Sequence, residues 1–271
     1  MKRRINTYLF LLLTVVIFGC NTKNETPQWK TGIQTYTFHN FTLTETLEKT
    51  EQLGLHYVEA FFFQSLGAGF PDTAYLNFDI PDEYREMLKT KLSEHDITWY
   101  ASGVAMYDNE GDWNRFFEFA SEMGLKLVTV EPALEDLDMV EALAKKYEIE
   151  VAIHNHPEPS VYAHPEVLVK ALRGRSEWMG VCADIGHWKR VGADPLEAVK
   201  QFEGRLKVIH LKDLNEQMED AAWGTGILPV QEVVEELKRQ KFDGLISIEY
   251  ENFSSSQMDD IQKSLDYLNS L

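Results

Sequence analysis

Val181-Cys-Ala-Asp-Ile-Gly-His-Trp188 is the stretch that decides the fold of this chain. It is a short apolar run that stops at Asp184, and two later apolar runs stop in the same way at His210 and at Glu249. A parallel β/α barrel gathers its functional side chains at the carboxyl ends of its strands. The three endings therefore predict such a barrel, with a divalent-metal site and a small polar substrate at that face.

Short β-rich runs alternate with amphipathic segments of helical length along most of the chain. We expect strands at 32–38, 57–62, 98–104, 126–130, 150–154, 179–184, 206–210 and 245–249. Helical patterns occupy 43–53, 81–95, 112–123, 134–147, 165–173, 195–202, 229–240 and 258–271. Eight strands alternating with eight helices are typical of a (β/α)8 TIM barrel, which we expect as one catalytic domain over 31–271.

An open, doubly wound sheet is the main alternative to the barrel. That fold usually carries a glycine-rich turn after its first strand, and this chain has Thr37-Phe-His-Asn-Phe41 there. Two connections, 64–80 and 214–228, are longer than a usual strand-to-helix loop. Both would leave from the carboxyl face, so each is either a substrate wall or lid, or a simple surface elaboration.

The first residues form an export signal rather than part of the fold. Basic residues at 2–4 precede the apolar run 9–19, which is too short to span a bilayer comfortably. The run stops at Gly19-Cys20 and resembles a bacterial lipoprotein signal, in which the cysteine is acylated. We expect a signal peptide over 1–19, a tether over 20–30 lipidated at Cys20, and an exported protein anchored to the periplasmic or surface face of a bacterial membrane. An ordinary secretory signal with a chance cysteine is the alternative.

Charge and cysteine content limit the partners and the covalent structure. The formal net charge is −18, which argues against nucleic acid as a partner because nucleic-acid binding needs a basic footprint. With Cys20 acylated, Cys182 is the one cysteine left, so no internal disulfide is expected and Cys182 is a small buried side chain. The sequence leaves the oligomeric state open, a homo-oligomer included.

The fifth expected strand ends in His154-Asn155-His156. Alternation along a strand places the two histidines on one side and Asn155 on the other. Two histidines at the active end of a barrel favour metal binding or contact with a sugar hydroxyl. Solvent exposure or a capping role for one of them is the alternative.

From Gly32 to its end, the chain resembles the xylose isomerase-like barrel superfamily, in its sugar phosphate isomerase/epimerase branch. The segments that carry the resemblance are Gly54-Leu-His-Tyr-Val-Glu59, His154-Asn-His156, Asp184-Ile-Gly-His187, His210-Leu-Lys-Asp213, Gly224-Thr-Gly226 and Ile248-Glu-Tyr-Glu251. The resemblance implies a divalent ion on four ligands from strands five to eight, which match His154, Asp184, His210 and Glu249. Epimerases of the family usually carry Glu at the position of His154, so a symmetric two-carboxylate epimerisation is not expected.

Mixed carboxylate and imidazole ligands suit Mn, Co, Zn or Mg. Such an ion stabilises the enediolate formed when a proton leaves the carbon next to a carbonyl. Glu249 or Glu131 is the candidate base, and Glu131 is also an alternative fourth ligand or a cap of the following helix. His187 is a candidate proton shuttle or substrate-oxygen contact, and Lys212 a candidate charge stabiliser.

Aromatic residues near strand ends are candidates for the wall of a sugar site, although they are more often core residues. The expected substrate contacts are His156, Trp188, Tyr100, Phe38 and Phe62.

The sequence thus predicts a divalent-metal-dependent isomerase or epimerase of a sugar or keto-sugar. A lyase or dehydratase acting on an oxidised sugar, and a sugar-binding lipoprotein without catalysis, stay open because a fold does not fix chemistry. A phosphodiesterase like the abasic-site endonucleases would need a basic groove. An exported location favours neutral or oxidised sugars over phosphorylated ones.

Overall fold

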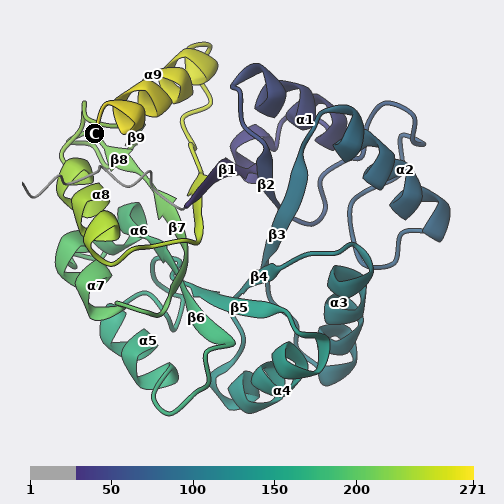
Figure 1. The fold of residues 1–271 in the computed structure, drawn as a ribbon, viewed down its shortest axis with the longest axis horizontal. Coiled ribbons are helices and arrows are strands. Elements are labelled where there is room, and N and C mark those ends of the chain that lie inside the picture. The colour runs from purple at the N-terminus through teal and green to yellow at the C-terminus, as the bar shows by residue number, and fades with distance from the viewer. Residues whose placement is uncertain (1–28) are drawn as a thin grey trace, which may run out of the picture.

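Eight parallel strands close a barrel in the order β1-β10-β7-β6-β5-β4-β3-β2, and helices surround it (Figure 1). This computed structural model describes residues 29–271; the expected signal peptide, Cys20 and the tether up to residue 28 lie outside the described residues. The predicted (β/α)8 barrel is confirmed. None of the helices within residues 29–271 is long and apolar enough to cross a membrane.

The barrel strands are β1 Lys30–Gln34, β2 Tyr57–Ala60, β3 Thr98–Ala105, β4 Leu127–Val130, β5 Glu150–His154, β6 Met179–Asp184, β7 Leu206–Leu211 and β10 Leu245–Ile248. The helices are α1 Leu43–Gln52, α2 Asp82–Glu94, α3 Glu110–Glu122, α4 Leu137–Tyr147, α5 Pro165–Ala171, α6 Ile185–Arg190, α7 Pro195–Gln201, α8 Val230–Arg239 and α9 Gln257–Ser270. Two short 3-10 helices, η1 (Thr35–Phe38) and η2 (Leu134–Asp136), and a hairpin of β8 (Asp213–Leu214) and β9 (Asp220–Ala221) complete the described elements. Helix α6 and the hairpin were not predicted.

The first strand begins at Lys30, inside the segment predicted as a tether, and ends earlier than predicted, at Gln34. The Gln34 side chain accepts a hydrogen bond from the Tyr36 backbone N–H and donates one to the Gly103 carbonyl. These bonds turn the chain into η1. The Thr37 hydroxyl then joins η1 to the end of β10 by donating to the Ile248 carbonyl at 3.0 Å. Residues 35–38 therefore form part of the rim of the barrel rather than a strand.

Small and aliphatic side chains fill the part of the barrel interior nearer the strand starts. They form one buried cluster: Ala101, Leu127, Ala152, Cys182, Val208 and Leu245. Cys182 is fully buried, as the sequence predicts. Because this end is packed, the polar side chains of the interior gather at the carboxyl ends of the strands.

Asp213 organises the long connection that follows β7. Its Oδ1 accepts hydrogen bonds from the backbone N–H groups of Leu214 and Leu228, and its Oδ2 accepts those of Gly224 and Gly226. A Cβ at Gly226 would lie 2.3 Å from Asp213 Oδ1, so this position needs glycine. The Gly-Thr-Gly segment therefore shapes a loop around a buried carboxylate.

Asp213→Ala should lower the free energy of unfolding by about 3–5 kcal/mol, because it leaves four backbone N–H groups without their acceptor. Urea unfolding followed by circular dichroism measures this loss, with Glu216→Ala, at an exposed position of the same loop, as the control. A loss below about 1 kcal/mol for Asp213→Ala would show that water replaces the carboxylate readily.

Candidate active site

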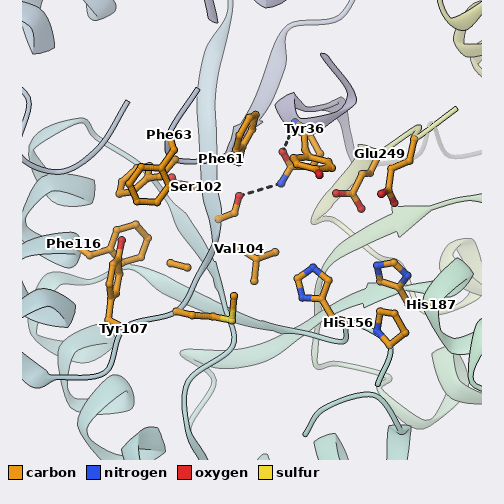
Figure 2. Close-up of a pocket in the computed structure, with 17 residues that line it drawn as sticks. Tyr36, Phe61, Phe63, Ser102, Val104, Tyr107, Phe116, His156, His187 and Glu249 are labelled. Carbon is orange, nitrogen blue, oxygen red and sulfur yellow. Dashed lines mark hydrogen bonds between the residues drawn. The ribbon is translucent and has the colours of Figure 1, made fainter. Parts of the chain in front are cut away.

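A cavity of about 500 Å³ opens at the carboxyl ends of the strands. One side of it carries the titratable groups, and Figure 2 shows His156, His187 and Glu249 there. The opposite side is apolar and aromatic, with Phe61, Phe63 and Tyr107 among its residues (Figure 2). The cavity therefore has a chemically reactive side and an apolar side.

Four predicted ligands, His154, Asp184, His210 and Glu249, form one group at the polar side of the barrel mouth. They end β5 and β6, lie near the end of β7 and follow β10, and their ligand atoms all lie within 4.8 Å of one another. His210 Nδ1 lies 3.8 Å from Asp184 Oδ2 and 3.2 Å from Glu249 Oε2. Two ligands about 2.1 Å from a tetrahedral ion are separated by about 3.4 Å, so these distances suit ligands of one ion.

Three atoms of this four-residue group are buried without a hydrogen-bond partner among the described residues. They are His154 Nε2, Asp184 Oδ2 and His210 Nδ1. His154 Nε2 has no neighbour to bind among the described residues, and Asp184 Oδ2 and His210 Nδ1 have only ionisable neighbours at 3.2 Å, Lys212 Nζ and Glu249 Oε2. Leaving a buried polar atom unpaired costs about 1–3 kcal/mol, a cost that a ligand shared by these atoms would offset. A divalent cation satisfies two imidazole nitrogens and carboxylate oxygens together. The residues present therefore fit a metal ion.

Buried carboxylates hold the far ring nitrogen of both histidines in the group. His154 Nδ1 lies 3.1 Å from Glu131 Oε1, and His210 Nε2 lies 2.9 Å from Glu59 Oε2. Burial lowers the pKa of His154. Because a carboxylate accepts, His154 Nδ1 is the nitrogen that donates to Glu131. Each carboxylate orients its imidazole so that the other nitrogen faces the group, an arrangement typical of metal-bound histidine. Sequence reasoning did not assign this role to Glu59.

Glu131 supports two histidines and does not face the cavity. Its Oε1 accepts hydrogen bonds from the rings of His154 and His156 and from the His156 backbone N–H, and its Oε2 accepts one from the Ser160 hydroxyl. Burial acts to raise the pKa of Glu131, but the hydrogen bonds from the two histidines hold it well below its usual value. The structure thus corrects the expectation that Glu131 is a base or the fourth ligand: His154 stands in that place.

The two strand-end histidines point the same way, as alternation predicts, and Asn155 points to the neighbouring strand. The Asn155 amide donates to the Asp184 carbonyl at 2.9 Å and accepts from the Asp184 N–H at 2.8 Å. This pair of bonds fixes the end of β6 against the end of β5. His156 lines the cavity with its side chain partly exposed.

Lys212 is a buried ammonium placed among carboxylates. Its Nζ lies 3.2 Å from Asp184 Oδ2 and 3.0 Å from Glu249 Oε2, and it also donates to Glu251. Burial opposes the charge, but Asp184 and Glu249 raise the pKa of Lys212 well above its usual value. Lys212 therefore offsets the negative charge of the group from behind, since it does not line the cavity.

His187 lies in the first turn of α6, where its backbone N–H donates to Asp184 Oδ1 at 2.7 Å. Its Nδ1 lies 3.0 Å from Arg190 Nη1. A guanidinium can only donate, so Nδ1 accepts and the proton of the neutral ring is on Nε2. Burial, with the nearby Lys212 ammonium acting in the same direction, lowers the pKa of His187 to about 3. His187 therefore presents a neutral N–H donor at the cavity wall.

Arg190 contacts the site through His187, and sequence reasoning missed it. Its guanidinium is held 2.8 Å from Asp220 Oδ1 and donates to the Met218 carbonyl, both on the hairpin loop after β7. By holding Arg190, this loop fixes which ring nitrogen of His187 carries the proton, and it does so from outside the cavity. Its partner Asp220 also accepts the backbone N–H of Glu251.

Arg190→Ala should abolish the preference of His187 for the Nε2–H form, and Arg190→Lys should largely retain it. The ¹⁵N spectrum of histidine-labelled protein measures this, because protonated and bare ring nitrogens have different shifts. An unchanged His187 signal in Arg190→Ala would contradict the assigned role.

Three of the aromatic residues expected to contact substrate lie elsewhere. Phe38 and Trp188 are buried in the core, with Trp188 stacked on Phe202 at 5.7 Å. Tyr100 lines a separate cavity near the strand starts. Strand periodicity does not tell a cavity wall from the core, which is why these assignments fail; Phe62 does line the active-site cavity.

The solved structure of an uncharacterised protein from Parabacteroides distasonis ATCC 8503 is 57% identical to this chain, with a TM-score of 0.76 over 90% of this chain and 99% of that one. The apo 3-keto-D-glucoside 4-epimerase YcjR from E. coli has 14% identity and a TM-score of 0.67, over 90% and 100% of the two chains. A zinc-bound IOLI protein has 17% identity and a TM-score of 0.66, over 88% and 95%. At such low identity the last two show a shared fold alone.

No curated protein matches the chain. The family model described as xylose isomerase-like TIM barrel matches residues 47–271, most of the described chain. The chain belongs to the xylose isomerase-like TIM barrel family.

Proposed function

We propose that this protein is a divalent-metal-dependent enzyme that removes a proton next to the carbonyl of a sugar or keto-sugar and returns it to give an isomer or epimer. The observation that carries the proposal is the four-residue group, whose ligand atoms lie within 4.8 Å of one another beside an open cavity. Solved relatives of the same fold that act on keto-sugars or bind zinc agree with this chemistry.

In this proposal His154, Asp184, His210 and Glu249 hold the ion, with Mn, Co, Zn and Mg all compatible with the ligand set. The bound ion supplies Lewis acidity, which stabilises negative charge on the substrate oxygen. Glu249 lines the cavity and is the candidate base. His187 offers its Nε2–H to a substrate oxygen, and Lys212 limits the charge that accumulates on the carboxylates.

The position of His154 argues against proton transfer by two equivalent carboxylates. Its Nδ1–H is bound to Glu131 and its Nε2 faces the group, so the ring has no nitrogen free to act as a base. A second proton-transfer group would therefore be another residue of the cavity lining, where His156, His187 and Glu251 are available.

The contacts of His156 support a lyase or dehydratase as the second candidate. Burial acts against the charged form of His156, but its hydrogen bond to Glu131 raises its pKa above the usual value. A partly exposed imidazolium at the cavity can protonate a leaving group. Elimination would thus use the same base and the same ion, with His156 as the acid.

Proton–deuterium exchange tests the proposal. Metal-loaded protein in D₂O is incubated with a panel of neutral keto-sugars and oxidised glycosides, and NMR follows loss of the proton next to the carbonyl. Exchange with return of an isomer supports the first candidate, and loss of a substituent supports the second. Absence of exchange across the panel with fully metal-loaded protein would refute both.

We also propose that the protein is exported and anchored through an acylated Cys20, as the signal-like amino terminus suggests. Cys20→Ser should move it from the membrane fraction to the soluble fraction, because a serine cannot receive the thioether-linked lipid. Fractionation followed by mass spectrometry of the mature amino terminus measures this. Unchanged membrane association of Cys20→Ser would argue against the anchor.

A further inference from the structure

The apolar side of the active-site cavity is built from the residues that follow two neighbouring strands and from η1. Phe61 and Phe63 follow β2, Met106 and Tyr107 follow β3, and Tyr36 lies in η1. Figure 2 shows Phe61, Phe63 and Tyr107 across the cavity from His156, His187 and Glu249. This apolar wall is therefore separate from the metal-ligand group but faces the same space.

Large apolar side chains of this wall remain exposed. Phe63 is 75% exposed, Met106 60% and Tyr36 39%. Burying a side chain of this size is worth about 1.5–3 kcal/mol, so leaving several exposed around one cavity marks a binding surface. The exposed parts of these side chains are not covered by other described residues.

Aromatic packing behind the wall keeps it in shape. Phe62 contacts Phe116 edge-on with their ring centroids 5.4 Å apart, and Tyr107 packs against Phe116 at 5.5 Å. The Tyr36 and Phe61 rings are also edge to face, at 5.3 Å. A wall supported in this way is ready to receive a flat or ring-shaped group without rearranging.

The charge distribution excludes a phosphate at the apolar side. The cavity lining contains no lysine or arginine, and its charged or titratable carboxylates and imidazoles, His156, His187, Glu249 and Glu251, all belong to the reactive side. A phosphate against the aromatic wall would lose its water with no cation in return, which is costly. The part of the substrate that lies there therefore carries no negative charge.

We propose that this wall is a subsite for a second ring, so that the substrate is a glycoside: a sugar oxidised to a ketone and joined through its glycosidic oxygen to an uncharged ring. The proposal rests on the proposed function, which places the reacting sugar at the four-residue group. A cavity of about 500 Å³ is within the range of pockets that enclose ligands larger than one sugar ring. In this proposal Phe63 and Met106 contact the second ring, and Tyr36 and Phe61 complete the lining of the subsite.

Isothermal titration calorimetry of the metal-loaded protein tests the subsite. The probes are the methyl glycoside, the phenyl glycoside and the glucosyl disaccharide of one keto-sugar. We expect the two ligands with a second ring to bind at least about tenfold more tightly than the methyl glycoside. The stronger of the two identifies whether the second ring is aromatic or a sugar.

Phe63→Ala and Met106→Ala should each remove most of that preference while changing the affinity for the methyl glycoside less than about twofold. Both positions are exposed, so the variants should fold. Leu134→Ala is the control, because Leu134 is an exposed apolar side chain, 46% accessible, that lies outside this cavity and outside the adjoining one lined by Phe63. It should keep the full preference.

Equal binding of all three glycosides, or a preference that survives both substitutions, would overturn the subsite. Deuterium exchange on the same ligands separates this result from the proposed function. Exchange at equal efficiency with methyl and phenyl glycosides would retain the enzyme chemistry and reject the subsite. A second-ring preference without any exchange would retain the subsite as a binding site and reject the chemistry.

Discussion

Glu249→Gln should reduce turnover by about 10⁴-fold or more and should also lower the amount of bound metal. The substitution removes a ligand charge and the candidate base in one step, and a positioned acid–base group alone is worth about 10²–10⁴-fold. Glu249 Oε2 lies 3.2 Å from His210 Nδ1 and 3.0 Å from Lys212 Nζ. A neutral amide at this position would therefore also remove one of the negative charges that stabilise the buried Lys212 ammonium. Exchange kinetics and metal analysis of the same preparation measure both effects.

Glu216→Gln is the control for Glu249→Gln, since it removes a carboxylate from an exposed position of a loop at the same end of the barrel. It should leave metal content and turnover unchanged. If Glu249→Gln kept full metal and more than about a tenth of the turnover, Glu249 would be neither ligand nor base.

His187→Asn should reduce turnover by about 10²–10⁴-fold and leave the metal content near that of the unaltered protein. Asparagine can donate a hydrogen bond but cannot take or return a proton at this site. His187 lies at the cavity wall with its Nε2 3.6 Å from Asp184 Oδ2, and its proton faces away from Arg190. His187 also belongs to two other groups of residues that could hold an ion, with His154 and His156 or with Glu249 and Glu251, so the metal content of the variant has to be measured beside its turnover.

Kinetics and metal content measured together decide between three accounts of His187. Near-normal turnover would mean that the residue only completes the first turn of α6. Loss of the metal would make His187 a ligand. Low turnover with the metal retained is the result that its contacts predict.

The strand-end pattern predicted the fold and the meeting of Asp184, His210 and Glu249 at one face, and the family resemblance added His154 to them. An apolar strand that stops at Asp184 or His154 ends at the carboxyl face of the barrel, where polar side chains gather. The predicted bounds of β5 and β6 agree with the structure. Helix α6 escaped prediction because it is short and begins at Ile185, directly after β6, with Asp184 as its N-cap.

Partners distant in sequence could not be read from local patterns. Glu59 meets His210 across 151 positions, and Arg190 acts through a loop that only the folded hairpin brings near. Aromatic residues were misassigned for a related reason, since Trp188 is typical of both a cavity wall and a core. The Phe61-Phe62-Phe63 run follows β2 as Glu249 follows β10, so the same strand-end rule would have pointed to this part of the apolar wall.

The position of a bound ion tests the central claim most directly. Crystals of the cobalt-loaded protein, measured on both sides of the cobalt absorption edge, should give one anomalous peak about 2.0–2.2 Å from His154 Nε2, Asp184 Oδ2, His210 Nδ1 and a Glu249 oxygen. A peak bound by other residues, or no peak at this group while Lys212 keeps its contacts to Asp184 and Glu249, would contradict the claim that these four residues form a metal centre.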